Sequence, residues 1–231
     1  MIDKSAMEGA PHGVVVIAET QHAGRGRSGR TWYSPKGGVW LSILIRCQGD
    51  QTVVDALPFI GAVAIAKTLI ANWRVKAQVR WPNDVVVGGR KIAGVLVESK
   101  SRGNKLAYAI LGLGINANFR TVEIEPIKES STSLLNLVGR PVSRERLIAA
   151  VLSEVEATYD AVNAVGEGAL LEILGRLDWS HGKQVTVKTQ DKEFTGLFQD
   201  YESLSRARIR TKDGLESVEA STVISVDYKS N

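Results

Sequence analysis

The sequence contains a single cysteine, Cys47, among 231 residues. One thiol cannot form an internal disulfide or build a cysteine-based metal cluster, so both kinds of scaffold are excluded. Cys47 ends the apolar run VWLSILIRC, which fits a small residue at a strand end better than a nucleophile. The three histidines, His12, His22 and His181, are scattered and lack cysteine or carboxylate partners at ligand spacing. A structural zinc site is therefore not expected.

Long apolar runs are also missing. No stretch approaches the roughly 20 uninterrupted apolar residues of a membrane-spanning helix, and the start, MIDKSAMEGAPHG, lacks the apolar centre of a secretion signal. We therefore expect a cytoplasmic protein with no membrane partner. The net charge of +4 permits a nucleic-acid or acidic partner without requiring one. The 44% hydrophobic content is enough for one sizeable α/β domain plus a small appendage.

The first part of the chain has the pattern of a sheet with helices. Short apolar runs at 14–19 and 39–46 predict strands, and apolar residues at helical spacing predict a helix over 53–73. The segments QVRW, DVVVGGRKIAGVLVES and KLAYAILGLGIN follow, and the glycine pair in VGGRK predicts a hairpin turn. Together they predict a mostly antiparallel or mixed sheet.

The second part begins after two further helices, expected at 143–165 with Ser143 as N-cap and at 167–174. After Trp179 the helical period disappears, and short β-rich pieces alternate with turn signals such as KDG. This pattern predicts a small barrel of about five strands, with a boundary near residues 178–183. No Pro-rich or Ser-rich linker separates the two parts, so we expect them to pack directly.

The stretch GRGRSGRTW has the spacing G-x-G-x-x-G at Gly24, Gly26 and Gly29. A dinucleotide-binding turn needs a helix directly after such glycines, but here TWYSPKGG and a strand follow, so that interpretation is disfavoured. The stretch also carries guanidinium and indole groups from Arg25, Arg27, Arg30 and Trp32. Guanidinium groups bind carboxylates and phosphates in a fork geometry, and glycines let a segment bend. The residues favour a mobile flap over an anionic, partly aromatic ligand, and a solvated surface loop remains the alternative.

A second motif, RWPNDVVVGGRKIAGVLVE, places Asn83 and Asp84 where a strand begins and Lys91 on the return strand. The hairpin brings an ammonium group near a carboxylate. An amide, a carboxylate and an ammonium group would suit phosphate, Mg²⁺ and transition-state charge, respectively. The small residue Gly94 would let a ligand approach closely. A hairpin with an ordinary surface ion pair is the alternative.

A third motif, GLGIN, places Gly112 and Asn116 at the end of the strand LAYAIL. Glycines at a strand end usually mark a turn, but they also expose backbone N–H groups to a ligand. No serine lies in a G-x-S-x-G context, so a hydrolase triad finds no support.

The succession of AETQHAGRGRSGRTWYSPKGG, VRWPNDVVVGGRKIAGVLVE, GLGIN and STSL before a helix resembles the biotin-protein ligases over about residues 8–230. The resemblance implies an α/β (α+β) fold. A catalytic domain, residues 1–180, would have a mixed sheet flanked by helices, related to class II aminoacyl-tRNA synthetases and lipoate ligases. Residues 181–231 would form an SH3-like barrel.

The resemblance also implies a two-step reaction with ATP and Mg²⁺. The biotin carboxylate attacks the α-phosphate of ATP to give biotinyl-5′-AMP and pyrophosphate, and a lysine of a biotin carboxyl carrier protein then takes the biotinyl group. Arg27 and Lys91 would be the catalytic residues that neutralise carboxylate and phosphate. The residues implied in biotin or adenylate binding are Gln21, Gly24, Arg25, Gly26, Arg27, Arg30, Trp32, Lys91, Gly94, Gly112 and Asn116. Asn83, Asp84 and Asn116 would serve the ATP and Mg²⁺ side, without a metal site formed by protein alone.

Two departures from the family pattern bear on these expectations. The usual opening strand with a Ser-Thr-Asn signature is not found, so we expect that the chain starts at an internal point of the family's domain. No winged helix precedes the ligase motifs, so no DNA partner is expected. Dimerisation occurs in the family, and a homodimer is possible here. The alternatives are a lipoate-type ligase on the same scaffold and a non-catalytic protein that binds a carrier or nucleic acid.

Overall fold

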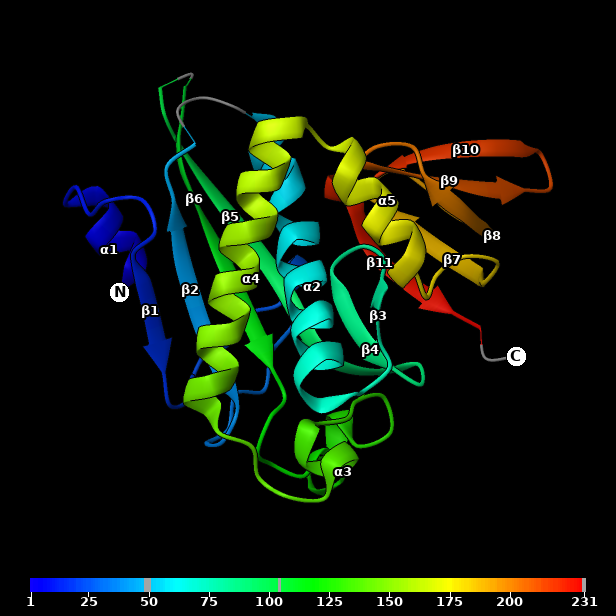
Figure 1. The fold of residues 1–231 in the computed structure, drawn as a ribbon. Helices are drawn as coiled ribbons and strands as arrows, with labels where there is room; N and C mark the ends of the chain where they lie inside the picture. The colour runs from blue at the N-terminus through cyan, green and yellow to red at the C-terminus, as the bar shows by residue number, and fades with distance from the viewer. Residues whose placement is uncertain (48–50, 104, 230–231) are drawn as a thin grey trace.

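Two antiparallel sheets organise the chain in the computed structural model, which describes residues 1–47, 51–103 and 105–229 (Figure 1). The larger sheet has six strands in the order β1-β2-β6-β5-β4-β3. They are β1 (Val15–Ala18), β2 (Val39–Ile45), β3 (Ala77–Arg80), β4 (Asp84–Val87), β5 (Arg90–Arg102) and β6 (Lys105–Ile115). The predicted strands are confirmed. Of the two pairings that the sequence predicts, the mostly antiparallel one is confirmed and the mixed one is not, because all pairings between these strands are antiparallel. Short hairpin connections impose this pairing from β3 to β6.

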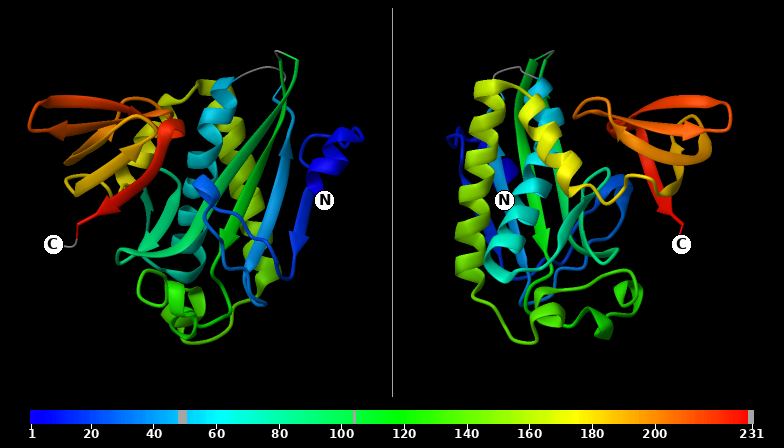
Figure 2. Two further views of the ribbon diagram at one scale, coloured as in Figure 1. Left: turned by 180° about the vertical axis from the view of Figure 1, so that it is seen from behind. Right: turned by 45° about the vertical axis from the view of Figure 1, so that its right-hand side comes forward.

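Three helices lie on one face of this sheet: α2 (Gln51–Trp73), α4 (Arg144–Val165) and α5 (Gly168–Leu177) (Figures 1 and 2). The first and the last extend slightly beyond the predicted ranges. The predicted N-cap of α4 is confirmed, since the hydroxyl of Ser143 accepts a hydrogen bond from the backbone N–H of Arg146 at 3.2 Å. The apolar sides of these helices and of the strands form the main core.

Helix α2 is the innermost of the three. Gly61 permits its close approach to the sheet, because a Cβ there would lie 2.8 Å from Cδ2 of Leu113. By length and composition α2 could cross a membrane, although Asp55 and Lys67 interrupt its apolar residues. However, 72% of its most apolar stretch is buried inside the protein, as in a core helix.

The opposite face of the sheet is only partly covered. Helix α1 (Ile2–Met7) packs there, with Ile2 and Ala6 against Leu44, Tyr108 and Ile110. The rest of this face is seen from behind in the left panel of Figure 2, where the chain between β1 and β2 crosses it. We call this surface the open face.

The second sheet has five strands in the order β10-β9-β8-β7-β11, all antiparallel. They are β7 (Gln184–Thr189), β8 (Glu193–Tyr201), β9 (Arg206–Thr211), β10 (Gly214–Glu219) and β11 (Val223–Tyr228). The predicted number of strands is confirmed, whereas the closed SH3-like arrangement remains a prediction. The domain boundary between residues 180 and 181 also remains a prediction, because the buried apolar cluster is continuous between the two sheets. At the junction, the rings of Trp81 and Phe198 lie 5.8 Å apart.

Candidate active site

A cavity of about 620 Å³ lies between the open face, the chain at 21–33 and strand β11. Its volume is in the range of small-molecule sites. Apart from Gly24, all the residues singled out from the sequence line it: Gln21, Arg25, Gly26, Arg27, Arg30, Trp32, Asn83, Asp84, Lys91, Gly94, Gly112 and Asn116. The three sequence motifs therefore meet at one place.

The glycine-arginine segment is a hairpin rather than an irregular loop. The backbone N–H of Trp32 donates to the carbonyl of Gly24 at 2.9 Å, and Gly26 N–H donates to the carbonyl of Arg30 at 2.7 Å. Gly24 is buried, and a Cβ there would lie 2.3 Å from the Trp32 carbonyl oxygen. Gly24 therefore allows the two hairpin arms to approach each other, and its expected contact with the ligand remains a prediction. At the tip, Ser28 and Gly29 adopt positive φ angles of 53° and 73°.

The arginines of this hairpin contact four residues in two parts of the chain, on β5 and at the start of β11. Arg25 forms an ion pair with Glu98 at 2.9 Å. The Nη2 atom of Arg27 donates to the carbonyl of Ala220 at 2.5 Å and to that of Val223 at 3.1 Å. Arg30 donates to the carbonyl of Ile224 at 3.4 Å. Burial lowers the pKa of Arg27, and the nearby Asp84 carboxylate opposes that shift. The hairpin is thus anchored to the beginning of β11.

The charged centre of the cavity is Asp84. Its Oδ1 lies 2.5 Å from Nζ of Lys91, and its Oδ2 lies 2.8 Å from Nη2 of Arg80. Burial alone would raise the pKa of Asp84, but Lys91 and Arg80 together lower it below the ordinary value. The carboxylate is therefore ionised near neutral pH, and the pairing predicted between Lys91 and Asp84 is confirmed.

Strand register places a row of residues side by side on the open face. Arg80 is opposite Asp84, Asp84 is opposite Gly94, Gly94 is opposite Gly114, and Gly114 is opposite Trp40. Because the two glycines lack side chains, they leave a shallow floor beside the charged centre. Register therefore brings this floor and the ion pair together.

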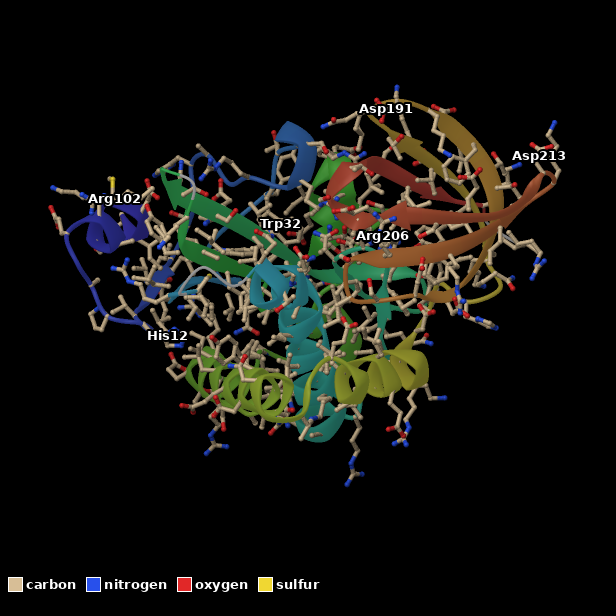
Figure 3. All side chains as sticks on the ribbon, turned by 90° about the horizontal axis from the view of Figure 1, so that it is seen from above. His12, Trp32, Arg102, Asp191, Arg206 and Asp213 are labelled. Carbon is tan, nitrogen blue, oxygen red and sulfur yellow. The ribbon has the colours of Figure 1, made fainter. Side chains whose placement is uncertain are left out.

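The ring of Trp32 lies on that floor. Cβ atoms at Gly94 and Gly114 would fall 3.0 Å and 2.7 Å, respectively, from the nearest ring atoms. The ring centroid is 4.8 Å from Nζ of Lys91, a cation–π distance. Its indole N–H is buried without a hydrogen-bond partner among the described residues. Figure 3 shows Trp32 near the middle of the molecule, far from the labelled surface residues at either end.

The two asparagines hold backbone in place. The Asn116 amide donates to the carbonyl of Thr132 at 2.9 Å and to that of Lys91 at 3.4 Å. The Asn83 amide donates to the carbonyl of Val95 at 2.5 Å. The backbone of Lys91 is also bonded on both sides, to Ser130 and Thr132. Both asparagines line the cavity, and their expected contact with nucleotide remains a prediction.

Sequence reasoning missed several lining residues, including Arg80, Glu98 and strand β11. Arg80 was within reach, because it faces Asp84 across a three-residue turn. Strand β11 could not be predicted as part of the site, because it contacts the hairpin at 21–34, which is about 190 residues earlier in the chain. No group of three or more His, Cys, Asp or Glu side chains in the described ranges could hold a metal ion.

The cavity lies on the open face of an antiparallel sheet with helices behind it, and its lining brings together five cationic side chains and three carboxylates. Residues 3–116 match the Biotin/lipoate A/B protein ligase family. The chain belongs to this family. It is 32% identical to the bifunctional ligase/repressor BirA of Escherichia coli over 186 residues, which are 80% of this chain and 58% of that protein. It is 29% identical to the biotin--[acetyl-CoA-carboxylase] ligase of Paracoccus denitrificans over 216 residues, 90% and 88% of the two chains.

The fold is shared with a solved biotin protein ligase. The structure from Aquifex aeolicus in complex with biotin and ATP superimposes with a TM-score of 0.83 and 25% identity, covering 98% of this chain and 94% of that one. By contrast, the chain spans between 48% and 66% of the lengths of several curated relatives.

Proposed function

We propose that this chain is an ATP-dependent biotin-protein ligase that forms biotinyl-5′-AMP and transfers biotin to a lysine of a biotin carboxyl carrier protein. The observation that carries the proposal is the charged centre around Asp84 beside the glycine floor and Trp32. The chain belongs to the biotin/lipoate ligase family, and relatives that it matches are named biotin ligases. Both findings support biotin as the substrate.

The first step needs neutralisation of negative charge at two groups. A carboxylate oxygen of biotin attacks the α-phosphorus of ATP, and the bond to pyrophosphate breaks. Lys91 is a cation fixed at the centre of the cavity, and among the described residues Arg27 donates through Nη2 only, to two carbonyls. The Nε and Nη1 groups of Arg27 are thus available to an anionic oxygen. Together the two residues would stabilise the acyl-adenylate oxygens.

Magnesium fits this site only together with the nucleotide. Both carboxylate oxygens of Asp84 are paired with cations, which leaves this residue poorly suited as a direct metal ligand. We propose that Mg²⁺ arrives on the ATP phosphates, where it would supply further charge neutralisation.

The second step needs protection of the adenylate. A carrier lysine attacks the acyl carbon and AMP leaves, but water would do the same if it reached the mixed anhydride. The hairpin at 21–34 covers one side of the cavity, and Trp32 covers its floor. We propose that these elements close over the adenylate until the carrier arrives, as expected for a flap.

The proposal is tested by biotin-dependent exchange of labelled pyrophosphate into ATP, followed by transfer of label to a carrier domain. Biotin is expected to support exchange, and a carrier whose acceptor lysine is replaced by arginine should stay unlabelled. Exchange with lipoate alone would indicate a lipoate ligase. Carrier binding without any exchange would indicate a non-catalytic protein, and either result would overturn the proposal.

A matched pair of variants tests the role of the hairpin. Arg27→Ala should keep the fold but weaken biotin binding and release biotinyl-AMP faster, because an anion contact is lost. Arg102→Ala removes an exposed guanidinium at the far end of β5, outside the cavity, and should behave as the unchanged protein. Equal adenylate retention in both variants would contradict the assignment of Arg27.

A further inference from the structure

Arg80 occupies a position between the charged centre and the C-terminal sheet. It is the last residue of β3 and lies opposite Asp84 across the turn that leads into β4. Its side chain is 19% exposed, and Nη2 contacts Oδ2 of Asp84 at 2.8 Å. Nη1 donates to the carbonyl of Gly89 at 3.3 Å. One guanidinium group therefore fixes both ends of β4.

Two aromatic rings hold this guanidinium group. Its Cζ lies 5.7 Å from the ring centroids of both Trp179 and Tyr228. The two rings also contact each other edge-on, at 5.0 Å. Cation–π contacts of this kind are strongest where water is excluded. We refer to Trp179 and Tyr228 as the aromatic clamp.

The clamp is itself fixed to the sheet. The hydroxyl of Tyr228 donates to the carbonyl of Trp81 at 2.9 Å, and it is also within 2.9 Å of the Ser180 hydroxyl. The backbone N–H of Trp81 donates to the same Ser180 hydroxyl oxygen at 2.9 Å. Burial raises the pKa of Tyr228, so its hydroxyl keeps its proton as a donor. The C-terminal sheet is thus bonded to the residue next to Arg80.

We propose, on the basis of the proposed ligase function, that Arg80 is a positioning residue for Lys91 in adenylate formation. Arg80 holds one oxygen of Asp84, which directs the other oxygen to the Lys91 ammonium group. Without Arg80 the carboxylate is free to rotate, and the ammonium group loses its fixed place beside the reacting phosphate. The aromatic clamp makes the C-terminal sheet a part of this arrangement.

The charged and titratable groups that face Asp84 come from four elements. Lys91 lies on β5, Arg80 on β3 and Arg27 on the hairpin, while Tyr228 faces it from β11. Removing Arg80 takes away one of the two direct cation partners, so Asp84 would protonate at higher pH. If protonation of Asp84 causes kcat to fall at low pH, that fall, the acid limb of the pH profile, must then occur at higher pH in the variant.

The test measures kcat and KM of biotin-dependent pyrophosphate exchange against pH for folded wild type, Arg80→Met and Arg80→Lys. Arg80→Met should lower kcat about tenfold or more, since small misplacements of reacting groups have large effects on rate. The KM for biotin should change less than kcat, because Arg80→Met weakens only the Lys91 contact and keeps those of Arg27 and the glycine floor. The acid limb should move to higher pH, and Arg80→Lys should recover most of both changes.

Two further variants separate this role from simple loss of structure. Arg90→Met removes a guanidinium group that bonds the Lys128 carbonyl at 2.6 Å and does not line the cavity. Its kcat and acid limb should match wild type. Trp179→Ala alters the clamp without touching the cavity, and should reproduce the Arg80→Met changes in weaker form.

The outcomes distinguish this inference from the proposed function. No biotin-dependent exchange by wild type would end the proposed function. Active wild type with Arg80→Met indistinguishable from Arg90→Met in kcat and acid limb would overturn the role of Arg80 alone. If Arg80→Met does not fold, Arg80→Lys and Trp179→Ala decide: a wild-type kcat and pH profile in Trp179→Ala would refute the clamp.

Discussion

A methyl group added at Gly114 should disturb the site without disturbing the sheet. The new Cβ would lie 2.7 Å from Cε2 and Nε1 of Trp32, whereas carbon atoms in contact prefer about 3.5–4.0 Å. The ring must therefore move by about 1 Å. Gly114 is fixed between β2 and β5, but Trp32 belongs to a hairpin at the surface, so the hairpin yields.

The size of the effect follows from the cost of overpacking, about 1–3 kcal/mol. Since Trp32 lines the cavity in which we propose that the adenylate binds, we expect this cost to fall on retention of the ligand. Gly114→Ala should speed biotinyl-AMP dissociation about 5- to 150-fold, at about tenfold for each 1.4 kcal/mol. The midpoint of urea unfolding should change little.

The assay is the rate of release of preformed biotinyl-AMP, measured in a double-mutant cycle with Trp32→Ala. In the Trp32→Ala protein there is no ring to displace, so Gly114→Ala should have almost no additional effect. An undiminished effect of Gly114→Ala in that background, or no effect in the wild-type background, would refute the argument.

Three other changes have expected outcomes in urea unfolding. Ser180→Ala leaves the N–H of Trp81 without its buried acceptor and should destabilise the fold by about 1–3 kcal/mol; an unchanged midpoint contradicts this. Because the folded pKa of Asp84 is lowered, its stabilisation is complete above the unfolded pKa, about 4, and is lost as pH falls through the folded value. The difference between wild type and Asp84→Asn should therefore shrink below about pH 4, and a constant difference is the contrary result. Gly175→Ala, in an open position of α5, should stabilise by about 0.5–1 kcal/mol; a lower midpoint argues against it.

Local patterns were sufficient to predict most of the fold. Hairpins and strands follow from alternation and glycine turns, and α4 follows from a serine cap and helical spacing. The sequence left a mostly antiparallel and a mixed sheet open; the antiparallel one is confirmed, because the connections from β3 to β6 are too short for the crossovers that parallel pairing needs. Whether the C-terminal strands close into a barrel depends on pairings between edges, which no local pattern encodes.

The site was predictable where its residues lie in one motif. Asp84 and Lys91 meet because a single hairpin brings them together, and the sequence shows that hairpin directly. The contact of Arg27 with Ala220 joins residues 193 positions apart, and nothing near either residue signals it. Spacing alone also does not distinguish a glycine that faces a ligand from one that packs within its own hairpin, as Gly24 does.

The row of paired residues from Arg80 through Asp84, Gly94 and Gly114 to Trp40 forms only when the strands are in the correct register, so ligand binding depends on that register. A shift of β5 by one residue relative to β6 would turn Gly94 away from the open face and place bulky neighbours such as Val95 on the floor beneath Trp32. A misaligned sheet can keep the same number of hydrogen bonds, but it loses the glycine floor. Refolded preparations can thus be graded for correct strand register by ligand retention, which a measurement of secondary-structure content would not detect.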